Sequence, residues 1–388
     1  MHIIHITPYY TPAYAFGGVV RACEGMTQAL AQQGHQVTVI TSDSLNSGQR
    51  LQGPLEENIH GVQVLRVPNY APWLRGKFNL SSPKGLRAQA AKHLDQADIV
   101  HVHEYRTLEN LLLIPEIRKR HIPIVLSPHG TLNTSTGRST LKKLWDHFLS
   151  PRIAHDITHI VVLAENEAEE VRAVWKNFAP PLVEDQISII PNGVNMHTFS
   201  QIGDGSAFRK RYQIGDSETV VLYMGRLQER KNVDLLIRAF QQADVPNSRL
   251  VIAGPDEGML ERLQPLIDAR VILTGFLDGE ARLEAFAAAN LFALAARGEG
   301  LSMAMLEAMA AGLPLLISPE CNFPQAETEG VGRVLEIDQT AWAQALRQAL
   351  TDPQWLKEGG KRSQVLIERD YIWDSIALRL ESLYLSLL

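Results

Sequence analysis

The sequence predicts an α/β protein built from two doubly wound, Rossmann-like domains. Short runs rich in valine and isoleucine alternate with helical patterns from the first residues onward, which is typical of a parallel sheet with crossover helices. The same alternation restarts after residue 215. A length of 388 residues suits two or three domains, each able to bury its own core.

Apolar runs in the first half predict seven strands, with helices between most of them. In order they read IIHIT, QVTVIT, VQVLRV, DIVHVH, IPIVLS, HIVVLA and ISIIP. The N-terminus, MHIIHITPYY, leads directly into the first strand without the basic region and long apolar core of a signal peptide. We therefore expect the N-terminus to be part of the fold.

The second half predicts five more strands, TVVLYMG, RLVIAG, RVILTG, NLFALA and LPLLIS. Helices are expected between them, near 232–243, 257–267, 280–289 and 301–312. The polar segments PNGVN and SQIGDGS, between Pro191 and Gly215, interrupt the pattern and predict a hinge. We expect an N-terminal acceptor-side domain at 1–195 and a ligand-binding domain at 196–370, facing each other across a cleft. Residues 371–388 are expected to form a helix that crosses back to the first domain.

Composition and charge exclude several function classes. Hydrophobic residues make up 45% and charged residues 21%, the proportions of a soluble globular protein. The net charge of −6 argues against a nucleic-acid partner. Only Cys23 and Cys321 occur, too few for a disulfide framework or a thiolate metal cluster, so a reducing cytoplasm is the simplest location. No apolar run approaches the roughly 18 residues of a spanning helix.

Residues 66–152 are unusually basic, with 14 Lys/Arg against 6 Asp/Glu. Four aromatic residues accompany these charges: Trp73, Phe78, Trp145 and Phe148. A basic, aromatic surface suits peripheral contact with an anionic membrane, and GRSTLKKLWDHFL at 137–149 is the best candidate for it. The alternative is a solvated helix with Trp145 and Phe148 in the core.

The first strand-to-helix turn argues against a dinucleotide-dependent oxidoreductase. A dinucleotide fingerprint needs G-x-G-x-x-G at this turn and an acidic residue about 20 positions later. The chain has TPYYTPAYAFGGVVR, in which only Gly17 and Gly18 open the helix. The fingerprint is absent.

The segment EGLSMAMLEAMAAGLPLLISP, which begins at Glu299, carries two acidic residues eight positions apart. At about 1.5 Å per helical residue, Glu299 and Glu307 lie ~12 Å apart along a helix axis, a span that suits the two ends of a nucleotide sugar. We expect the helix to start just after Gly300, so that its free N–H groups face a diphosphate. The alternative is a chance pair on a helix whose Met/Ala stripe packs in the core.

The segment GRLQERKN predicts a phosphate clamp. Arg226 follows a strand, and Lys231 opens the next helix beside Asn232, a candidate N-cap. Charge-assisted hydrogen bonds of such cations contribute roughly 1.5–3 kcal/mol each. The alternative is a solvated loop of mixed charge, because Glu229 and Arg230 lie there too. The chain has no D-x-D triplet, the acidic pair with which many enzymes hold a metal ion beside a diphosphate.

These two motifs together resemble the retaining, metal-independent glycosyltransferases of the GT-B fold, family 4 (glycosyl transferases group 1). Further matches are Gly17-Gly18, His129-Gly130 after IPIVLSP, the hinge IIPNGVN, and GFLDGEARLEAFAAAN at 275–290. Each match alone is weak, but their order and spacing cover essentially the whole chain.

The resemblance implies roles around the donor nucleotide. Arg226 and Lys231 would neutralise the diphosphate, and Glu307 would accept hydrogen bonds from the ribose. Backbone groups would assist at six further residues: Gly17, Gly18, Leu301 and Ser302 near the phosphates, and Phe276 and Leu277 at the base.

The resemblance also implies roles around the sugar. Glu299, with Gly300, would hold hydroxyls of the donor sugar, and His129 would approach it from the first domain, so that Glu299 and His129 are the expected catalytic residues. His103 and Glu104 could line the acceptor side. His101 is expected to pack, and we expect neither His101 nor His103 to have other metal-ligand side chains nearby.

One position departs from the family pattern. Many members have Gly-Phe-Gly-Leu after the first glutamate, where this chain has Gly300-Leu301-Ser302-Met303. Ser302 replaces a glycine where the backbone is expected to approach phosphate. Its hydroxyl can donate a hydrogen bond, and hexosamine donors become an option beside glucose.

The expected function is transfer of a hexose, with glucose first, from a UDP-sugar to a polysaccharide or lipid-linked glycan. The family implies retention of configuration, and a same-face displacement without a metal or other cofactor is the expected mechanism. We expect a cytoplasmic enzyme with at most peripheral contact with the inner face of the membrane. Two alternatives stay open. A UDP-sugar epimerase of GT-B fold would need no acceptor, and a non-catalytic UDP-sugar-binding protein would bind without turnover.

Overall fold

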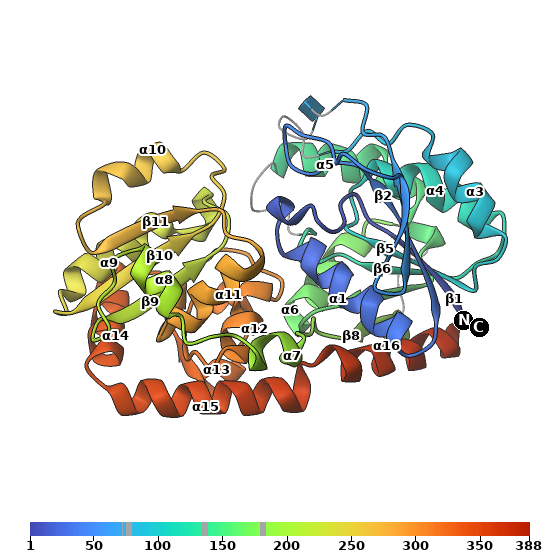
Figure 1. The fold of residues 1–388 in the computed structure, drawn as a ribbon. Helices are drawn as coiled ribbons and strands as arrows, with labels where there is room; N and C mark the ends of the chain where they lie inside the picture. Colours follow the sequence, from blue (N-terminus) through green and yellow to red (C-terminus); the bar gives the residue numbers. More distant parts are fainter. Residues whose placement is uncertain (72, 75–79, 133–138, 179–183) are drawn as a thin grey trace. The chain divides into compact units, whose positions relative to one another are not determined.

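The computed structural model divides the chain into two compact units. Unit 1 comprises Met1–Gly193 with Trp373–Leu388, and unit 2 comprises Val194–Ile372 (Figure 1). The boundaries expected after residues 195 and 370 lie two residues from these divisions. The structure describes residues 1–71, 73–74, 80–132, 139–178 and 184–388. Phe78 and positions 137–138 of the candidate membrane segment lie outside the described residues.

Unit 1 is built on an eight-stranded sheet. Its strands are β1 (His2–Ile6), β2 (Gln36–Ser42), β3 (Glu56–Ile59), β4 (Val62–Val67), β5 (Ile99–His103), β6 (Ile124–Ser127), β7 (His159–Val162) and β8 (Ile187–Ile189). Their order is β3-β4-β2-β1-β5-β6-β7-β8, and all neighbours are parallel except β3 and β4. All seven predicted strands are confirmed. Strand β3 was not predicted because EENI is a half-exposed edge strand without an apolar run.

Helices cover both faces of this sheet. They are α1 (Gly18–Gln32), α3 (Leu86–Leu94), α4 (Leu108–Arg118), α5 (Ser139–Phe148), α6 (Glu165–Trp175) and α16 (Trp373–Leu387), with 3-10 turns at Tyr14–Phe16, Ser150–Arg152, Ala154–Asp156 and Glu184–Gln186. Because side chains alternate along a strand, Val100 and Val102 of β5 enter one apolar core, whereas His101 and His103 lie on the opposite face.

The C-terminal helix α16 is packed into unit 1 beside α1 (Figure 1). A Cβ atom on Gly25 of α1 would lie 2.0 Å from the indole nitrogen of Trp373, so a glycine lets the two helices approach. Arg379 donates to the carbonyl of Ile189 at 2.6 Å. Among the described helices, none is long and apolar enough to cross a membrane.

Unit 2 is built on a six-stranded, fully parallel sheet. Its strands are β9 (Thr219–Met224), β10 (Ser248–Ala253), β11 (Val271–Gly275), β12 (Leu291–Leu294), β13 (Leu315–Ile317) and β14 (Gly332–Val334). Their order is β11-β10-β9-β12-β13-β14. The five predicted strands are confirmed. Strand β14 was not predicted because it has only three residues, GRV, and one of them is apolar.

The helices of unit 2 agree with three of the four predicted ranges to within a few residues. They are α7 (Met196–Ser200), α8 (Ser206–Arg211), α9 (Val233–Ala243), α10 (Leu260–Leu263), α11 (Gly279–Ala288), α12 (Met303–Ala310), α13 (Gln325–Thr328), α14 (Gln339–Leu350) and α15 (Pro353–Asp370), with 3-10 turns at Glu229–Lys231, Gln264–Leu266 and Pro319–Cys321. The helix expected at 257–267 is shorter and irregular. The carboxylate of Asp256 accepts from three successive N–H groups there, and one turn of α-helix continues as a 3-10 turn.

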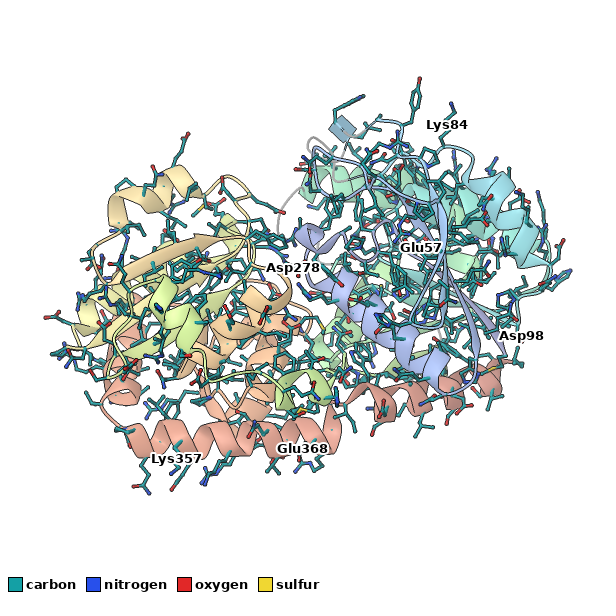
Figure 2. All side chains as sticks on the ribbon, in the orientation of Figure 1. Glu57, Lys84, Asp98, Asp278, Lys357 and Glu368 are labelled. Carbon is teal, nitrogen blue, oxygen red and sulfur yellow. The ribbon has the colours of Figure 1, made fainter. Side chains whose placement is uncertain are left out.

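Charged side chains lie on the outer face of α15. Lys357 and Glu368 both point away from unit 2 (Figure 2) and are exposed. The helix is therefore amphipathic: its inner face brings Gly359 and Gly360 against Pro314 and Gly312.

Each sheet has one point where the strand order reverses. In unit 1 the chain proceeds from β1 to one side through β2 and to the other through β5, and in unit 2 it proceeds from β9 through β10 and then through β12. Ligands of such sheets bind outside the carboxyl ends of the strands at this switch point. The loops after β9 and β12 are therefore the first place to examine in unit 2.

We predict that Gly254→Ala destabilises the protein. Gly254 follows β10, and a Cβ atom there would lie 1.8 Å from the carbonyl oxygen of Gly225 at the end of β9. Overpacking of this kind costs about 1–3 kcal/mol, which thermal unfolding would report as a lower Tm. Gly203→Ala is the control, because a Cβ atom there meets nothing within 4 Å. Equal Tm values for the two variants would contradict the prediction.

Candidate functional site

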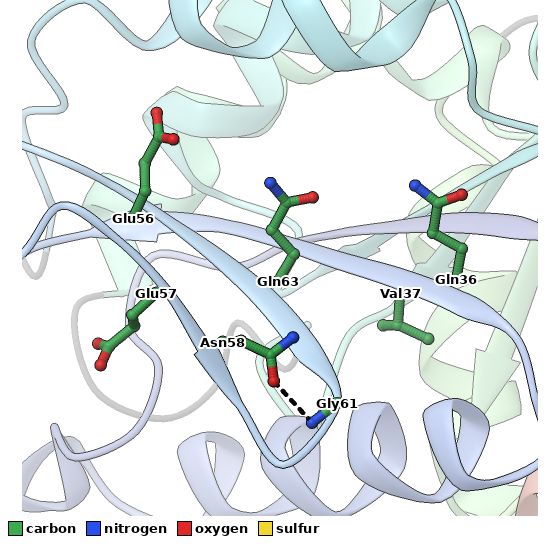
Figure 3. Close-up of a pocket in the computed structure, with 7 residues that line it drawn as sticks. All are labelled: Gln36, Val37, Glu56, Glu57, Asn58, Gly61 and Gln63. Atoms are coloured by element: carbon green, nitrogen blue, oxygen red, sulfur yellow. Dashed lines mark hydrogen bonds between the residues drawn. The ribbon is translucent and has the colours of Figure 1, made fainter.

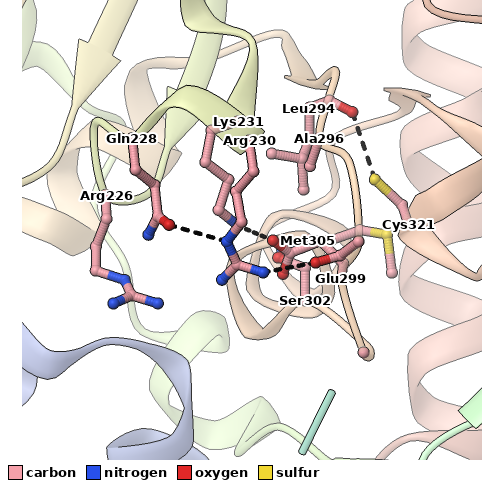
Figure 4. Close-up of polar contacts among 12 residues, drawn as sticks. Arg226, Gln228, Arg230, Lys231, Leu294, Ala296, Glu299, Ser302, Met305 and Cys321 are labelled. Atoms are coloured by element: carbon pink, nitrogen blue, oxygen red, sulfur yellow. Dashed lines mark hydrogen bonds and ion pairs between the residues drawn. The ribbon is translucent and has the colours of Figure 1, made fainter. Parts of the chain in front are cut away.

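Three loops of unit 2 meet at its switch point. The N–H of Arg297, after β12, donates to the carbonyl of Arg230 at 2.6 Å, and the side chain of Asn232 donates to the carbonyl of Ala295 at 2.8 Å. The N–H of Glu299 donates to the carbonyl of Glu320, after β13, at 3.0 Å. The structure therefore brings together the GRLQERKN and E-x7-E motifs, which are far apart in the sequence (Figure 4).

Lys231 and Glu299 form a buried ion pair across these loops. The Nζ atom of Lys231 donates to Oε1 of Glu299, and their side chains are only 9% and 12% exposed. Burial opposes ionisation of Glu299, but Lys231, Arg230 and Arg226 outweigh it and hold the pKa of the carboxyl below its usual value. Burial lowers the pKa of Lys231, and Glu299 opposes this shift. The residue predicted to bind the diphosphate, Lys231, is thus ion-paired with the residue predicted to bind the sugar, Glu299.

Two arginines extend this cationic group. Arg230 donates from Nη1 to the carbonyl of Gly298 at 2.6 Å and from Nε to Gln228 at 2.9 Å (Figure 4). Arg226 donates to Oε1 of Glu257 at 3.0 Å and keeps a partly exposed side chain. From the sequence, Arg230 was interpreted only as part of a possible mixed-charge loop. Its place directly before Lys231 in the sequence was the signal that could have identified it, and the structure puts both residues on one 3-10 turn.

Glu307, the predicted ribose ligand, is buried in α12 and paired with an arginine that the sequence analysis missed. Oε2 of Glu307 lies 2.6 Å from Nη1 of Arg282, which comes from α11. Both side chains are about one-tenth exposed or less. The carboxylate proposed to bind hydroxyls is thus one half of a buried ion pair.

Ser302 caps α12 instead of lying inside the helix. Helix α12 begins at Met303, two residues later than the start expected just after Gly300, and the hydroxyl of Ser302 accepts from the N–H of Met305 at 3.4 Å. Serine is a favoured N-cap residue, which explains why it can replace glycine. Leu301 and Ser302 are both buried. The side chain of Asn322, also missed, donates to the carbonyl of Gly300 at 3.2 Å and supports the loop.

Two further expectations in unit 2 concern its turns. Asn232 occupies the N-cap position of α9, but its side chain makes no capping hydrogen bond there because it binds Ala295. The turn predicted to meet the base lies directly after β11, where Gly275 has a φ of 73°. Phe276 is 45% exposed and Leu277 is half-buried, so this turn is accessible.

The other residues predicted to bind the donor nucleotide sugar belong to unit 1. Gly17 precedes α1 with a φ of 106°, a conformation that favours glycine, and Gly18 is the exposed first residue of the helix. The N–H of Gly17 donates to the carbonyl of Tyr14 at 3.0 Å, whereas that of Gly18 lies in the first turn of α1, where helices lack internal partners. His129 follows β6 with a φ of 54°. Burial lowers its pKa to about 4, so its ring is neutral near pH 7.

The acceptor-side prediction is wrong for His103. Its side chain is fully buried, with Nδ1 2.8 Å from Nε2 of His129, so it lines no accessible surface. The reason is that β5 lies in the middle of the sheet and its histidines face helices. Glu104, the next residue, is half-buried, with a φ of 59°, and its acceptor role stays a prediction.

The expectation that the histidines of β5 have no ligand-type neighbours is also wrong. Ligand atoms of His5, His101 and His103 lie within 4.8 Å of one another, as do those of Cys23, His103 and His129. Parallel pairing places His5 of β1 directly beside His101 of β5. However, the contacts from His103 to His5 and His129 are 2.9 and 2.8 Å, the lengths of hydrogen bonds. Two nitrogens on one tetrahedral zinc lie about 3.3 Å apart, since Zn–N bonds are about 2.0–2.1 Å.

A hollow on unit 1 lies away from its switch point. It is lined by β2, β3 and β4 (Figure 3), including Gln36 and Val37, the first two residues of β2. The contact drawn there joins the carbonyl oxygen of the Asn58 side chain to the N–H of Gly61 at 3.0 Å. Ligands of doubly wound sheets bind at the carboxyl ends, so this amino-end hollow is not the candidate site.

Comparison with known proteins decides the family. The family model for Glycosyltransferase Family 4 matches residues 16–198, and the family model for Glycosyl transferases group 1 matches residues 204–370. The chain therefore belongs to the group 1 glycosyltransferases of family 4. An uncharacterised glycosyltransferase of Methanocaldococcus jannaschii is 25% identical to this transferase over 99% of this chain and 98% of its own.

Solved structures confirm the predicted GT-B fold class of the transferase. Sucrose-phosphate synthase from Thermosynechococcus elongatus aligns over 100% of this chain and 98% of its own, with a TM-score of 0.79 and 21% identity. The Anabaena protein HepE in complex with UDP and glucose aligns over 100% of both chains, with a TM-score of 0.75 and 15% identity. At these identities the likeness establishes the fold alone.

The two cations of the predicted clamp differ in what their removal costs. We predict that Lys231→Ala destabilises the transferase by about 3–5 kcal/mol, because it leaves the Glu299 carboxylate buried without its partner. Arg226→Ala removes a partly exposed ion pair and is expected to cost less than about 1 kcal/mol. Urea unfolding measures both. A smaller loss for Lys231→Ala than for Arg226→Ala would contradict this picture of the site.

Proposed function

We propose that this transferase moves a hexose from a UDP-sugar, with UDP-glucose as the first donor to test, to a polysaccharide or lipid-linked glycan. The carrying observation is the group of Arg226, Arg230 and Lys231 at the carboxyl end of β9, beside Glu299. A departing nucleoside diphosphate develops negative charge, and fixed cations at that point lower the barrier directly. HepE, a structural neighbour, has been solved with UDP and with glucose, which supports UDP as the nucleotide.

The proposed roles are those that the family resemblance implies. Arg226 and Lys231 bind the diphosphate, with the backbone of Leu301 and Ser302 and of the Gly17-Gly18 turn. Glu307, paired with Arg282, accepts from the ribose hydroxyls, and the accessible Phe276-Leu277 turn meets the base. Glu299 and His129 contact the donor sugar.

We further propose that transfer retains configuration and needs no metal. The diphosphate charge is met by guanidinium and ammonium groups, the role that a divalent cation otherwise fills. Retention then follows from a same-face displacement through an oxocarbenium-like state, in which the leaving diphosphate stays beside the face that the acceptor attacks. This mechanism places no demand on a protein nucleophile.

Helix α5 supports peripheral contact with an anionic membrane, where a lipid-linked acceptor would lie. Leu141, Leu144 and Phe148 share one helical face and are 43%, 51% and 62% exposed. The alternative that placed Phe148 in the core is wrong, whereas Trp145 is half-buried. Lys143 is exposed on the same helix, so apolar and cationic groups occur together, as anionic interfaces favour.

The proposed reaction predicts a specific effect of Arg226→Ala. With UDP-glucose and a lipid-linked acceptor extract, in EDTA, the wild-type enzyme is expected to form a glycoside and release UDP. Arg226→Ala should lower kcat/KM about 10- to 100-fold, because a charge-assisted hydrogen bond contributes roughly 1.5–3 kcal/mol. A coupled assay of UDP release measures kcat/KM for the wild type and for Arg226→Ala.

Arg262→Ala is the matched control, since Arg262 is an exposed arginine of the same unit paired with Asp234. Its kcat/KM is expected to equal that of the wild type. Activity that disappears in EDTA and returns with Mn²⁺ would refute metal independence. Binding of UDP-glucose without any turnover would favour the non-catalytic alternative, and a changed sugar nucleotide without glycoside would favour the epimerase.

Membrane contact predicts that Leu144→Glu weakens sedimentation with phosphatidylglycerol vesicles at least about fivefold. The substitution places a carboxylate in the exposed apolar face of α5, where it opposes both burial in lipid and the anionic surface. Leu378→Glu on α16 is the control, because Leu378 is 54% exposed, close to the value for Leu144. Equal loss in both variants, or no wild-type binding, would rule out α5 as the contact.

A further inference from the structure

A row of hydrogen-bonded histidines leads through unit 1 to His129. Nδ1 of His5 lies 2.9 Å from Nε2 of His103, and Nδ1 of His103 lies 2.8 Å from Nε2 of His129. Adjacent rings stack with centroids 5.2 and 5.1 Å apart. His5 and His103 are fully buried, and His129 is 9% exposed. We call these three residues the histidine row.

The sheet topology produces this row. Strands β1, β5 and β6 are consecutive neighbours, and the parallel register pairs His5 with His101 and His103 with Ser127. Residues two apart on a strand share a face, so His103 lies on the face that carries His101 and His5. His129, two residues beyond Ser127, completes the row at the carboxyl end of the sheet.

The rings of the row are neutral at neutral pH. Burial lowers the pKa of His5 to about 3 and that of His129 to about 4, and burial with the neighbouring histidines lowers the pKa of His103 well below its usual value. A neutral imidazole has one N–H donor and one acceptor nitrogen. Two arrangements therefore satisfy both hydrogen bonds: every ring carries its proton on Nδ1, or every ring carries it on Nε2.

The ends of the row decide between these arrangements. Nδ1 of His129 and Nε2 of His5 have no hydrogen-bond partner among the described residues. One of them must be an unpaired N–H, which is rarer in proteins than an unpaired acceptor. Both atoms are buried, but His5 lies within β1, whereas His129 lies in the loop after β6, at the carboxyl edge of the sheet where doubly wound sheets bind ligands.

We propose that His5 and His103 are positioning residues that hold His129 as the Nδ1–H tautomer, so that this N–H donates to an oxygen of the donor sugar. The identity of that acceptor rests on the proposed function. The tautomer itself does not. His5, which touches no substrate in this account, thereby controls the donor character of a residue at the other end of the row.

His101 holds the row from the side. Its ring stacks on His103 with centroids 4.6 Å apart, and its two nitrogens lie 2.6 Å from the hydroxyl of Tyr384 and 2.8 Å from that of Ser127. Tyr384 is fully buried on α16. Tyr384 of the C-terminal helix thus holds the ring of His101, on which the ring of His103 stacks.

The experiment reads the tautomer directly. In the ligand-free full chain with ¹⁵N-labelled histidine at pH 7.5, long-range ¹H–¹⁵N spectra distinguish protonated from unprotonated ring nitrogens. We expect His129, assigned by its loss in His129→Asn, to carry its proton on Nδ1. In His5→Phe, which keeps a ring but loses the hydrogen bond, His129 should become a mixture. In His5→Asn, whose amide can donate from near the Nδ1 position, the Nδ1–H form should return.

Kinetics with UDP-glucose test the consequence. We expect His5→Phe to lower kcat/KM for the donor about fivefold, the value of a neutral hydrogen bond, and His5→Asn to restore most of it. His2→Phe is the matched control, because His2 is a buried histidine of the same strand bonded to Thr38 and Gln96, outside the row. Neither its kinetics nor the His129 tautomer should change.

The outcomes separate the two proposals. An Nε2–H tautomer at His129 in the wild type overturns the inference, whether or not the variants fold. A His129 tautomer that is unaffected in folded His5→Phe also overturns it. The expected tautomers without turnover of UDP-glucose would support the histidine row and count against the proposed donor.

Discussion

The buried ion pair between Lys231 and Glu299 is the interaction on which the candidate site depends. It joins the loop after β9 to the loop after β12, so it fixes the distance between the two motifs that the sequence analysis singled out. Taking two charges out of water costs several kcal/mol each, and a pair repays this only with good geometry and further hydrogen bonds. Arg230 is held by the carbonyl of Gly298, and Arg226 is held by Glu257. These two arginines supply the additional positive charge that keeps Glu299 ionised.

This pairing changes how the predicted roles fit together. The ammonium group proposed to meet a diphosphate is already held by the carboxylate proposed to meet the sugar. A bound diphosphate would share Lys231 with Glu299, so phosphate binding and orientation of the sugar-binding carboxylate become one event. Glu307 follows the same design with Arg282. Both acidic residues of the E-x7-E motif are thus paired with cations from another loop or helix.

Sequence patterns predicted the parts of the fold that depend on residues close together in the sequence. All twelve predicted strands were found because they are apolar runs. Strand β3 was missed because it is polar and half-exposed, and β14 because it has only three residues, one of them apolar. Arg226, Lys231, Glu299 and Glu307 were found because the family motifs contain them. Their partners are Arg282, Asn322 and Glu257, and no local pattern names them because tertiary packing alone brings them to the site.

The histidines show the same limit more sharply. His103 and His129 were noticed at strand ends, but His103 was assigned to an accessible surface. Its true surroundings depend on His5, which is 98 residues away in the sequence and adjacent only because β1 pairs with β5. A strand-by-strand reading predicts which face a residue shares with its own neighbours, and only the sheet order adds the neighbours on the next strand.

The central claim is that the cations after β9 bind a nucleoside diphosphate without a metal. Calorimetric titration of UDP, UMP and uridine in EDTA, with the wild type and with Arg226→Ala, tests it most directly. The account predicts that UDP binds at least about tenfold more tightly than uridine and that this gap narrows in Arg226→Ala, because each charge-assisted contact is worth about 1.5–3 kcal/mol. Equal affinity of the wild type for UDP and uridine would contradict it.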